Sequence, residues 1–455
     1  MPQATLNTDD TIVAAATPPG RGGVAIVRVS GPNVPKLLKY CLPISQPQPR
    51  HAYYVRLRDH SDHLIDEGLL IWFAAPESYT GEEVLEFQGH GNPVLVNAVI
   101  QYFIDQGCEH APPGGFTHRA FINGRIDLLQ AEAVADLINA DHQLAARAAM
   151  RSLQGEFSLM VQDLESELLN VRMHVEAAID FSDEDIDFES STTLKQHIST
   201  LHDQIHTILQ KAETGHVVHQ GLTAMIIGPP NVGKSSLFNA LCQEEAAIVT
   251  DYAGTTRDIL EREIIFNHIP FKLLDTAGIH LTDEPIEQVG IQRAIEAIES
   301  ADLILCMGDA TQHTLEDLKS FWTHSIGPNC PMERICWLFN KSDLSSTLSQ
   351  TTQQGIHISA KNRDKLDDLA TQALRTIGLE HNQLQTMIPA RKRHLYALEQ
   401  TAQHLAQALG AFDQQGLEIV AEHLKIAHQT LTALHGNADH EHVLSAIFSS
   451  FCIGK

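Results

Sequence analysis

The stretch Gly228-Pro-Pro-Asn-Val-Gly-Lys-Ser235 decides the fold of this 455-residue chain. It has the spacing of a glycine-rich phosphate-binding loop and lies between an apolar run, Thr223–Ile227, and a helical pattern, Ser236–Leu241. In this setting the glycines let successive backbone N–H groups point at phosphate oxygens, and the positive end of the helix favours negative charge. The sequence therefore predicts a P-loop α/β domain. Lys234 is expected to reach the outer phosphates and Ser235 to bind magnesium.

A second motif, Asn340-Lys-Ser-Asp343, follows the apolar run Ile335–Phe339. The Asp343 carboxylate can accept two hydrogen bonds, from the ring N–H and the exocyclic amine of guanine. Adenine offers neither, so a buried acceptor facing it would stay unpaired at a cost of about 1–3 kcal/mol. Ser359-Ala-Lys361 follows Ile356–Ile358 and matches the loop that lies behind guanine in GTP-binding proteins. These elements predict GTP rather than ATP.

The region between these motifs carries the elements expected to respond to the terminal phosphate. The run Leu273–Gly278 includes Asp275, a carboxylate expected to act on magnesium indirectly, and ends at Gly278, whose N–H can meet that phosphate. Thr256 is expected to close over magnesium. The next position is Ile279, where Ras-like switches have a water-orienting Gln. Either hydrolysis is very slow, or another residue holds the water and something other than an arginine finger offsets the charge.

Five separated segments thus contribute to one expected nucleotide site, and their order and spacing together predict GTP binding. The residues expected to bind GTP are Asn231, Val232, Gly233, Lys234, Ser235, Ser236, Thr255, Thr256, Asp275, Gly278, Asn340, Lys341, Asp343, Ser359, Ala360 and Lys361.

Three further signatures and the last four residues make the chain resemble the MnmE (TrmE) family of tRNA-modifying GTPases over nearly its whole length. These segments are Thr17–Val24, Ser78–Gly91, Arg119–Leu128 and Cys452–Lys455. The resemblance implies a multidomain α/β and α protein, with an N-terminal α+β folate-type module, a central helical bundle and an inserted Ras-like P-loop GTPase domain. Two local departures from the family pattern are Gly115, where the family usually has Glu, and His435–His440.

Compositional zones fit this organisation. Short β-type runs fill residues 1–118, and the alternation of strand and helix patterns fills 217–383, around the GTP motifs. Helical spacing fills residues 119–216 and 384–455. We therefore expect an N-terminal folate-binding and dimerisation domain, a discontinuous helical domain and a GTP-binding domain with these bounds. Because helical zones flank the α/β zone, switch movements would pass through both connections.

The resemblance implies that two GTP-binding domains meet across a dimer and that potassium takes the role of an arginine finger. Asn231 matches the family's potassium ligand, and groups of Thr250 and Thr255, partly backbone, would complete the site. A monovalent cation beside the bridging phosphate oxygens would offset charge that builds in the transition state. Magnesium would be held by Ser235 and Thr256.

The catalytic set implied by the resemblance is Glu287, Lys234 and Cys452. Glu287 matches the water-positioning acid, although Glu284 is close enough in sequence to be the alternative. Cys452 would deliver a thiol to the modification site, in an acid–base or nucleophilic role. A weakly lowered thiol pKa beside Lys455 would favour this reading, and an inert tail is the alternative.

The family's N-terminal module binds a folate one-carbon donor, 5,10-methylene- or formyl-tetrahydrofolate, and pairs with its copy in a homodimer. Arg21, Glu83 and Arg119 lie inside the matching signatures and could meet the pterin or glutamate ends of folate. Each could equally form a structural ion pair. An FAD-containing tRNA-modification partner would complete a heterotetramer that acts on tRNA.

The net charge of −26 is unusual for a protein that acts on RNA. Phosphate binding needs clustered Lys and Arg. The one basic cluster is Arg391–His394, which could equally be a solvated helix face, and the acidic run Asp180–Glu189 would repel RNA. We therefore expect a partner protein to supply most of the contacts with RNA.

Other compositional features favour a cytoplasmic protein without a membrane segment. No apolar run reaches the roughly 18–20 residues that cross a membrane. The start shows neither a secretory nor an import signal. The seven cysteines form no paired framework, and His440-Glu-His442 lacks a second group of ligands for a structural metal.

The preferred hypothesis is a potassium-activated GTPase. With its FAD-containing partner and a folate carbon, it would place a carboxymethylaminomethyl-type group on position 5 of the wobble uridine of certain tRNAs. One alternative is a regulatory GTPase of ribosome assembly, because other proteins with the motif Gly-Thr-Thr-Arg-Asp, here Gly254–Asp258, have that function. That function would need a basic domain that binds RNA, which this acidic chain lacks. A third possibility, a folate-dependent enzyme with a GTP switch, leaves Cys452–Lys455 unexplained.

Overall fold

The computed structural model describes residues 10–42, 44–180, 191–243, 261–266, 269–274, 298, 301–325, 332–344, 355–379, 381–412, 416–436, 447–448, 451 and 454. The chain divides into two compact units. The first comprises Met1–Ile138, Met150–His202 and Gln400–Lys455, and the second comprises Asn139–Ala149 and Asp203–Glu399. Three of the four divisions fall inside helices, namely α5 (Gln143–Leu153), α7 (Ser191–Gln220) and α13 (Lys392–Ala411).

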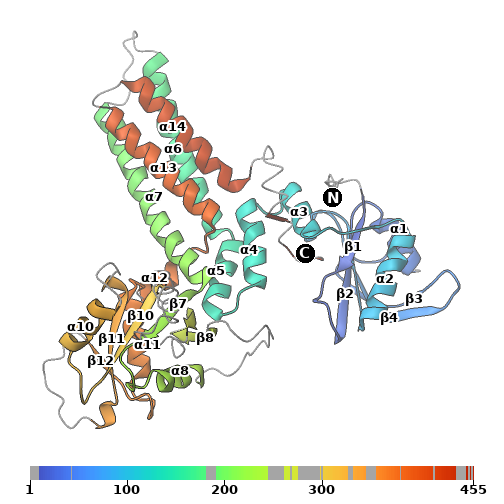
Figure 1. The fold of residues 1–455 in the computed structure, drawn as a ribbon. Helices are drawn as coiled ribbons and strands as arrows, with labels where there is room; N and C mark the ends of the chain where they lie inside the picture. Colours follow the sequence, from blue (N-terminus) through green and yellow to red (C-terminus); the bar gives the residue numbers. More distant parts are fainter. Residues whose placement is uncertain are drawn as a thin grey trace, which may run out of the picture. The chain divides into compact units, whose positions relative to one another are not determined.

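The first unit begins with a six-stranded sheet in the order β3-β4-β5-β2-β1-β6 (Figure 1). Its neighbouring strands are antiparallel except for the parallel pair β1 and β6. The strands are β1 (Ile12–Ala15), β2 (Gly22–Ser30), β3 (Ala52–Arg58), β4 (Leu64–Phe73), β5 (Val84–Gly91) and β6 (Glu109–His110).

Two helices, α1 (Val34–Cys41) and α2 (Pro93–Asp105), supply the rest of this core. Helix α2 starts sharply because the Asn92 side chain accepts a hydrogen bond from the backbone N–H of Val94, with Pro93 at the first helical position. Its apolar face places Phe103 in the same buried cluster as residues of β2 and β5. This part of the chain is therefore an α+β module, as the sequence predicts.

The rest of the first unit is helical. Helix α3 (Gly115–Ile122) belongs to the module, and α4 (Leu128–Ile138) follows it. Helix α6 (Glu156–Asp180) packs along α14 (Leu417–Thr432), beside which it lies in Figure 1. Buried residues recur in α6 at three- and four-residue spacing, which gives one apolar stripe that faces a neighbouring helix. The buried apolar residues are Phe157, Val161, Leu164, Leu168, Val171 and Val175. A short 3-10 helix, η3 (Ala433–His435), ends this segment.

The second unit holds another six-stranded sheet, in the order β12-β11-β10-β7-β9-β8. All neighbouring strands are parallel except β8 and β9. Strand β10 is buried along its whole length, as expected for a parallel strand covered on both faces. The strands are β7 (Leu222–Ile227), β8 (Glu261–Phe266), β9 (Ile269–Leu274), β10 (Leu303–Asp309), β11 (Ile335–Asn340) and β12 (Ile356–His357).

Helices and short turns complete this α/β unit. They are α8 (Lys234–Gln243), α10 (Leu315–Ser325), η1 (Met332–Arg334), η2 (Ser342–Leu344), α11 (Leu366–Thr376) and α12 (His381–Thr386). The predicted fold class, with an α+β module, a helical part and a P-loop α/β domain, is confirmed. None of the helices in the described ranges is long and apolar enough to span a bilayer.

The sheet register fixes where the functional loops meet. Strand β10 lies between β7 and β11, with Cys306 paired to Ile227 on one side and Asp309 paired to Asn340 on the other. Because parallel strands end at the same edge of a sheet, the loops that follow β7, β10 and β11 come together there, as in other open α/β sheets.

Candidate functional site

The phosphate-binding loop joins β7 to α8 and passes close to the neighbouring strands. A side chain at Gly228 would collide with the backbone carbonyl of Met307 in β10. A side chain at Gly233, whose φ is 101°, would collide with the Asn340 amide nitrogen. Both positions therefore require glycine for close approach, and Gly233 also requires it for its left-handed backbone.

Lys234 lies folded back across this loop. Its Nζ donates to the carbonyl oxygens of Gly228 and Pro229 at 2.8 and 2.9 Å. Burial lowers the pKa of the Lys234 ammonium. Ser235 and Ser236 follow in the exposed first turn of α8, where backbone N–H groups have no helical partner and favour an anion.

Asn340 connects the three loops of the site. This buried side chain donates from Nδ2 to the carbonyl of Val232 and accepts at Oδ1 from the backbone N–H of Ala360, both at 2.9 Å. One amide thus joins the phosphate-binding loop, the loop after β11 and the loop after β12. The sequence predicts Asn340 as a nucleotide-binding residue, and its observed contacts show that it holds the protein loops in register.

The predicted guanine acceptor is oriented by a neighbouring hydroxyl. Ser359, almost fully buried, donates from Oγ to Asp343 Oδ1 at 2.7 Å, while Asp343 itself is exposed in η2. The Ser359 hydroxyl also accepts from the backbone N–H of Asn362 at 3.3 Å. The carboxylate is therefore fixed in direction while it stays open to a ligand. Lys361 is exposed as well.

One polar residue of the site was missed by the sequence reasoning. Asp309, at the end of β10, accepts from Lys341 Nζ at 2.7 Å, and the same ammonium donates to the carbonyl of Asn231 at 2.9 Å. Burial would raise the pKa of Asp309, but hydrogen bonds from Lys341 and Thr311 outweigh it and lower that pKa to about 2. The available signal was a carboxylate two residues after the apolar run Leu303–Met307.

The expected metal-binding and catalytic residues are placed only in part. Ser235 fits a magnesium ligand, because its exposed hydroxyl lies one residue after Lys234 in the first turn of α8. Asn231 is exposed in the same loop, with a left-handed φ of 63°. Among the described residues no three His, Cys, Asp or Glu side chains gather as a metal site. Outside the described residues lie Thr250, Thr255, Thr256, Asp275, Gly278, Ile279, Glu284, Glu287 and Cys452.

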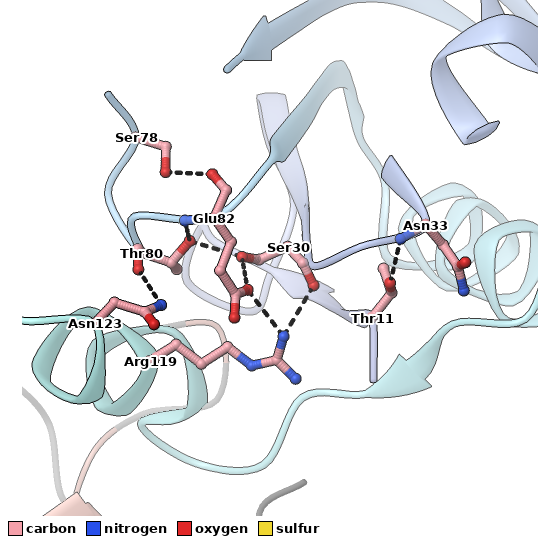
Figure 2. A network of polar contacts seen from close by, with 8 residues as sticks. All are labelled: Thr11, Ser30, Asn33, Ser78, Thr80, Glu82, Arg119 and Asn123. Atoms are coloured by element: carbon pink, nitrogen blue, oxygen red, sulfur yellow. Dashed lines mark hydrogen bonds and ion pairs between the residues drawn. The ribbon is translucent and has the colours of Figure 1, made fainter. Parts of the chain in front are cut away.

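In the N-terminal module, Arg119 belongs to a buried polar network (Figure 2). Its Nη1 donates to Glu82 Oε2 at 2.9 Å and to the Ser30 carbonyl at 3.3 Å. Ser30 Oγ donates to the same Glu82 oxygen at 2.8 Å and lies 2.7 Å from Thr80 Oγ1. Asn123 of the turn after α3 donates to the Thr80 carbonyl at 2.7 Å. The network joins β2, the loop before β5 and α3, so Arg119 forms a structural ion pair.

The other two predicted folate contacts are placed differently. Glu83 points to β4, where its Oε2 accepts from Trp72 Nε1 at 2.6 Å. Arg21 is exposed before β2. The structure thus assigns protein partners to Glu83 and Arg119, and of the three only Arg21 is exposed.

The described residues of the C-terminal segment return to the N-terminal module. The ring of Phe448 lies 4.8 Å from that of His118 and 6.3 Å from that of Phe121, measured between centroids. A side chain at Gly454 would collide with the carbonyl of Ala15 in β1. These contacts bring the chain on both sides of Cys452 to the module.

Comparisons with known proteins cover almost the whole chain. The family described as the GTP-binding protein TrmE N-terminus matches residues 11–125, and the MnmE helical domain matches residues 128–452. The tRNA modification GTPase MnmE of Stutzerimonas stutzeri (strain A1501) is 41% identical over 452 residues, which cover 98% of this chain and 99% of that protein.

Matches to solved structures are partial. Era of Aquifex aeolicus bound to GDP·AlF4⁻ is 26% identical and covers 40% of this chain and 66% of its own, with a TM-score of 0.27. The FeoB G-domain of Methanococcus jannaschii is 24% identical, and the match covers 34% of this chain and 97% of that domain, with a TM-score of 0.25. Scores this low carry no argument about function, whereas the family matches and the 41% identity do. The chain therefore belongs to the MnmE (TrmE) family of tRNA modification GTPases.

Proposed function

We propose that this protein hydrolyses GTP under activation by potassium and, with an FAD-containing partner, modifies position 5 of the wobble uridine of certain tRNAs. The added group is of the carboxymethylaminomethyl type, and a tetrahydrofolate supplies one carbon. The 41% identity to a tRNA modification GTPase across 98% of the chain supports the reaction class. The observation that most directly supports GTP binding is the position of the Asn340 side chain, which joins the phosphate-binding loop to both base-reading loops.

We assign nucleotide recognition to residues that the structure describes. Asp343, oriented by Ser359, accepts from the guanine ring N–H and amine. Lys234 would exchange its present carbonyl partners for the outer phosphate oxygens, and Ser235, in the first turn of α8, would hold magnesium. When bound, magnesium and potassium supply positive charge beside the phosphate oxygens.

The remaining proposed residues would act at the terminal phosphate. Asn231 holds potassium, together with groups of Thr250 and Thr255, and Thr256 binds magnesium. Glu287 positions the attacking water, since Ile279 has no polar group to do so. Asp275 and Gly278 respond to magnesium and to the terminal phosphate.

The N-terminal module is proposed to bind folate and to form a homodimer. Arg21 is free to contact the ligand, while Arg119 and Glu83 shape the module around it through their partners Glu82 and Trp72. The packing of Phe448 and Gly454 against the module supports a role for Cys452 there. We place the protein in the cytoplasm, where the FAD-containing partner supplies most of the contact with tRNA.

The decisive experiment is mass spectrometry of tRNA nucleosides from cells with and without the protein. Loss of the modified wobble uridine without the protein would support the proposal. An unchanged nucleoside profile, together with altered ribosomal subunits, would instead favour the ribosome-assembly alternative.

A second experiment tests the alkali-ion assignment directly. GTP turnover by the purified chain is compared in potassium and sodium buffers of equal ionic strength, for the parent and for Asn231→Ala. The parent should be faster in potassium, and the variant should lose most of that difference because it lacks the ligand. Equal parental rates in the two salts would refute the role of potassium.

A further inference from the structure

Strand β10 ends in a buried carboxylate that no nucleotide-binding motif includes. Asp309 is 3% exposed, and both of its oxygens are engaged. Oδ1 accepts from the backbone N–H and the hydroxyl of Thr311 at 2.9 and 2.6 Å, and Oδ2 accepts from Lys341 Nζ at 2.7 Å. A buried charge that is fully hydrogen-bonded in this way holds its partner in one place.

The partner, Lys341, belongs to the base-reading motif, and its ammonium bonds both to the end of β10 and to the phosphate-binding loop. Besides Asp309, it donates to the Asn231 carbonyl of the phosphate-binding loop. Lys341 and Asn231 both have left-handed backbones, with φ of 64° and 63°, a conformation that non-glycine residues rarely adopt. The bond therefore joins two constrained positions, one in each loop.

A lysine side chain loses much rotamer freedom when it is held in a single geometry. The Asn231 carbonyl alone offers one neutral acceptor, whereas Asp309 offers a charged one in the protein interior, where such bonds are stronger. Strand pairing fixes the position of Asp309, since its Cα pairs in register with that of Asn340. The position of the carboxylate is thus set by strand pairing rather than by a loop.

We propose that Asp309 is a positioning residue for guanine nucleotides: it holds Lys341 against the phosphate-binding loop and so keeps the base-binding and phosphate-binding loops at one separation. The inference rests on the proposed GTPase function and adds to it a residue outside the motifs. The alternative is that Asp309 only stabilises the turn after β10. It contacts Thr311 and His313 there, and His313 Nδ1 accepts from the Asp309 N–H at 3.1 Å.

A double-mutant cycle separates these two roles. Dissociation constants for a fluorescent GDP are measured on the full chain for the parent, Asp309→Asn, Lys341→Met and the double variant. Asp309→Asn keeps an acceptor for Thr311 but removes the charge that holds Lys341. We expect it to weaken GDP binding about tenfold or more, as for loss of a charged hydrogen bond. The double variant should bind within about twofold of Lys341→Met, because contacting residues are not additive. Independent, additive effects would overturn the proposal, as would unchanged binding by Asp309→Asn.

A matched control uses a carboxylate next to the other end of β10. Asp302 accepts from the Thr223 N–H at 2.8 Å, and Asp302→Asn removes one negative charge in the same way. It should leave GDP binding as in the parent. A loss equal to that of Asp309→Asn would show a general effect of charge on the fold and would overturn the positioning role.

A milder variant keeps the test decisive if Asp309→Asn does not fold. Thr311→Val removes one hydrogen-bond donor to Asp309 and leaves the charged groups of Asp309 and Lys341 in place. It should weaken GDP binding several-fold when Lys341 is present and should have no effect when it is combined with Lys341→Met. No effect in either background would overturn the inference. A separate comparison tests the proposed function: equal affinity of the parent for ADP and GDP would count against selection of guanine. The double-mutant cycle with GDP would still decide the role of Asp309.

Discussion

Two residues set the closest approach between the phosphate-binding and base-reading loops. Gly233 lies against the Asn340 amide, and that amide in turn bonds to Val232 and Ala360. Because the amide nitrogen fills the space where a β-carbon would lie, the glycine and the asparagine depend on each other.

Gly233→Ala should therefore impair nucleotide binding and lower stability by about 1–3 kcal/mol, through a strained left-handed backbone and displacement of Asn340. Gly221→Ala is a matched control, because Gly221 also has a positive φ, 76°, but open space around its β-position. Urea unfolding and GDP titration of both variants separate backbone strain from the collision. Similar GDP affinities for the two variants would contradict the role given to the contact.

Glu287→Ala bears on the proposed hydrolysis step. Removal of a positioned catalytic group should slow GTP turnover by about 10²–10⁴-fold while GTP affinity stays near that of the parent. Single-turnover hydrolysis and equilibrium binding measure the two quantities. Glu284→Ala is the informative neighbour, and a larger loss of turnover in that variant would move the water-positioning role to Glu284.

Residues of the site differ in how well sequence predicts them. Lys234, Asn340 and Asp343 were found because local spacing after an apolar run marks them. The contact of Asp309 with Lys341 joins residues 32 positions apart, and strand pairing brings them together. Likewise, nothing local reveals that Arg119 pairs with Glu82 and leaves the neighbouring Glu83 to Trp72.

At the scale of elements, the predicted strands and helices around the motifs are confirmed, because continuous apolar runs and three- to four-residue spacing are local signals. The helix pair α6 and α14 contains a feature that no pattern shows. Glu165 on α6 is 18% exposed and lies 3.7 Å from His435 Nε2. Burial raises the pKa of Glu165 to about 6, although a hydrogen bond from Thr432 acts in the opposite direction.

This pair of helices should lose stability as pH rises from about 4.5 to about 6. The unfolded chain releases the Glu165 proton near the ordinary glutamate pKa of 4.5 and the folded chain releases it near 6, so the folded state binds more protons in that window. The loss amounts to about 2 kcal/mol at neutral pH. Glu165→Gln should remove this dependence, whereas the exposed Glu167→Gln should not. Hydrogen exchange of α6 amides, corrected for intrinsic rates, would show the difference, and a flat parental profile would contradict it.

At the scale of the whole molecule, charge opposes contact with RNA. The net charge is −26, and the single basic cluster, Arg391–His394, is partly used by the fold. His394 is 2% exposed, and its Nδ1 accepts from the Arg391 N–H at 3.1 Å. The description of this cluster as a solvated helix face is therefore wrong for His394. Most of the acidic run Asp180–Glu189 lies outside the described residues.

The chain alone should accordingly bind tRNA weakly and without the steep salt dependence of basic proteins. Raising sodium chloride from about 50 to about 200 mM costs a protein with many phosphate contacts roughly 10³–10⁵ in affinity. We expect a far smaller change here, and a steeper one after the FAD-containing partner is added. Filter binding over a salt series measures both slopes. A slope for the chain alone as steep as that of the complex would show that it holds tRNA by its own basic groups.

Strand β10 belongs to neither nucleotide-binding loop, yet it lies between the strands from which both loops emerge. Each residue of a strand advances the chain by about 3.3 Å and reverses the side-chain direction. One inserted residue would therefore turn the Asp309 carboxylate to the opposite face and move the turn after it past its neighbours. The length of this strand thus determines whether one lysine can contact both the strand end and the phosphate-binding loop.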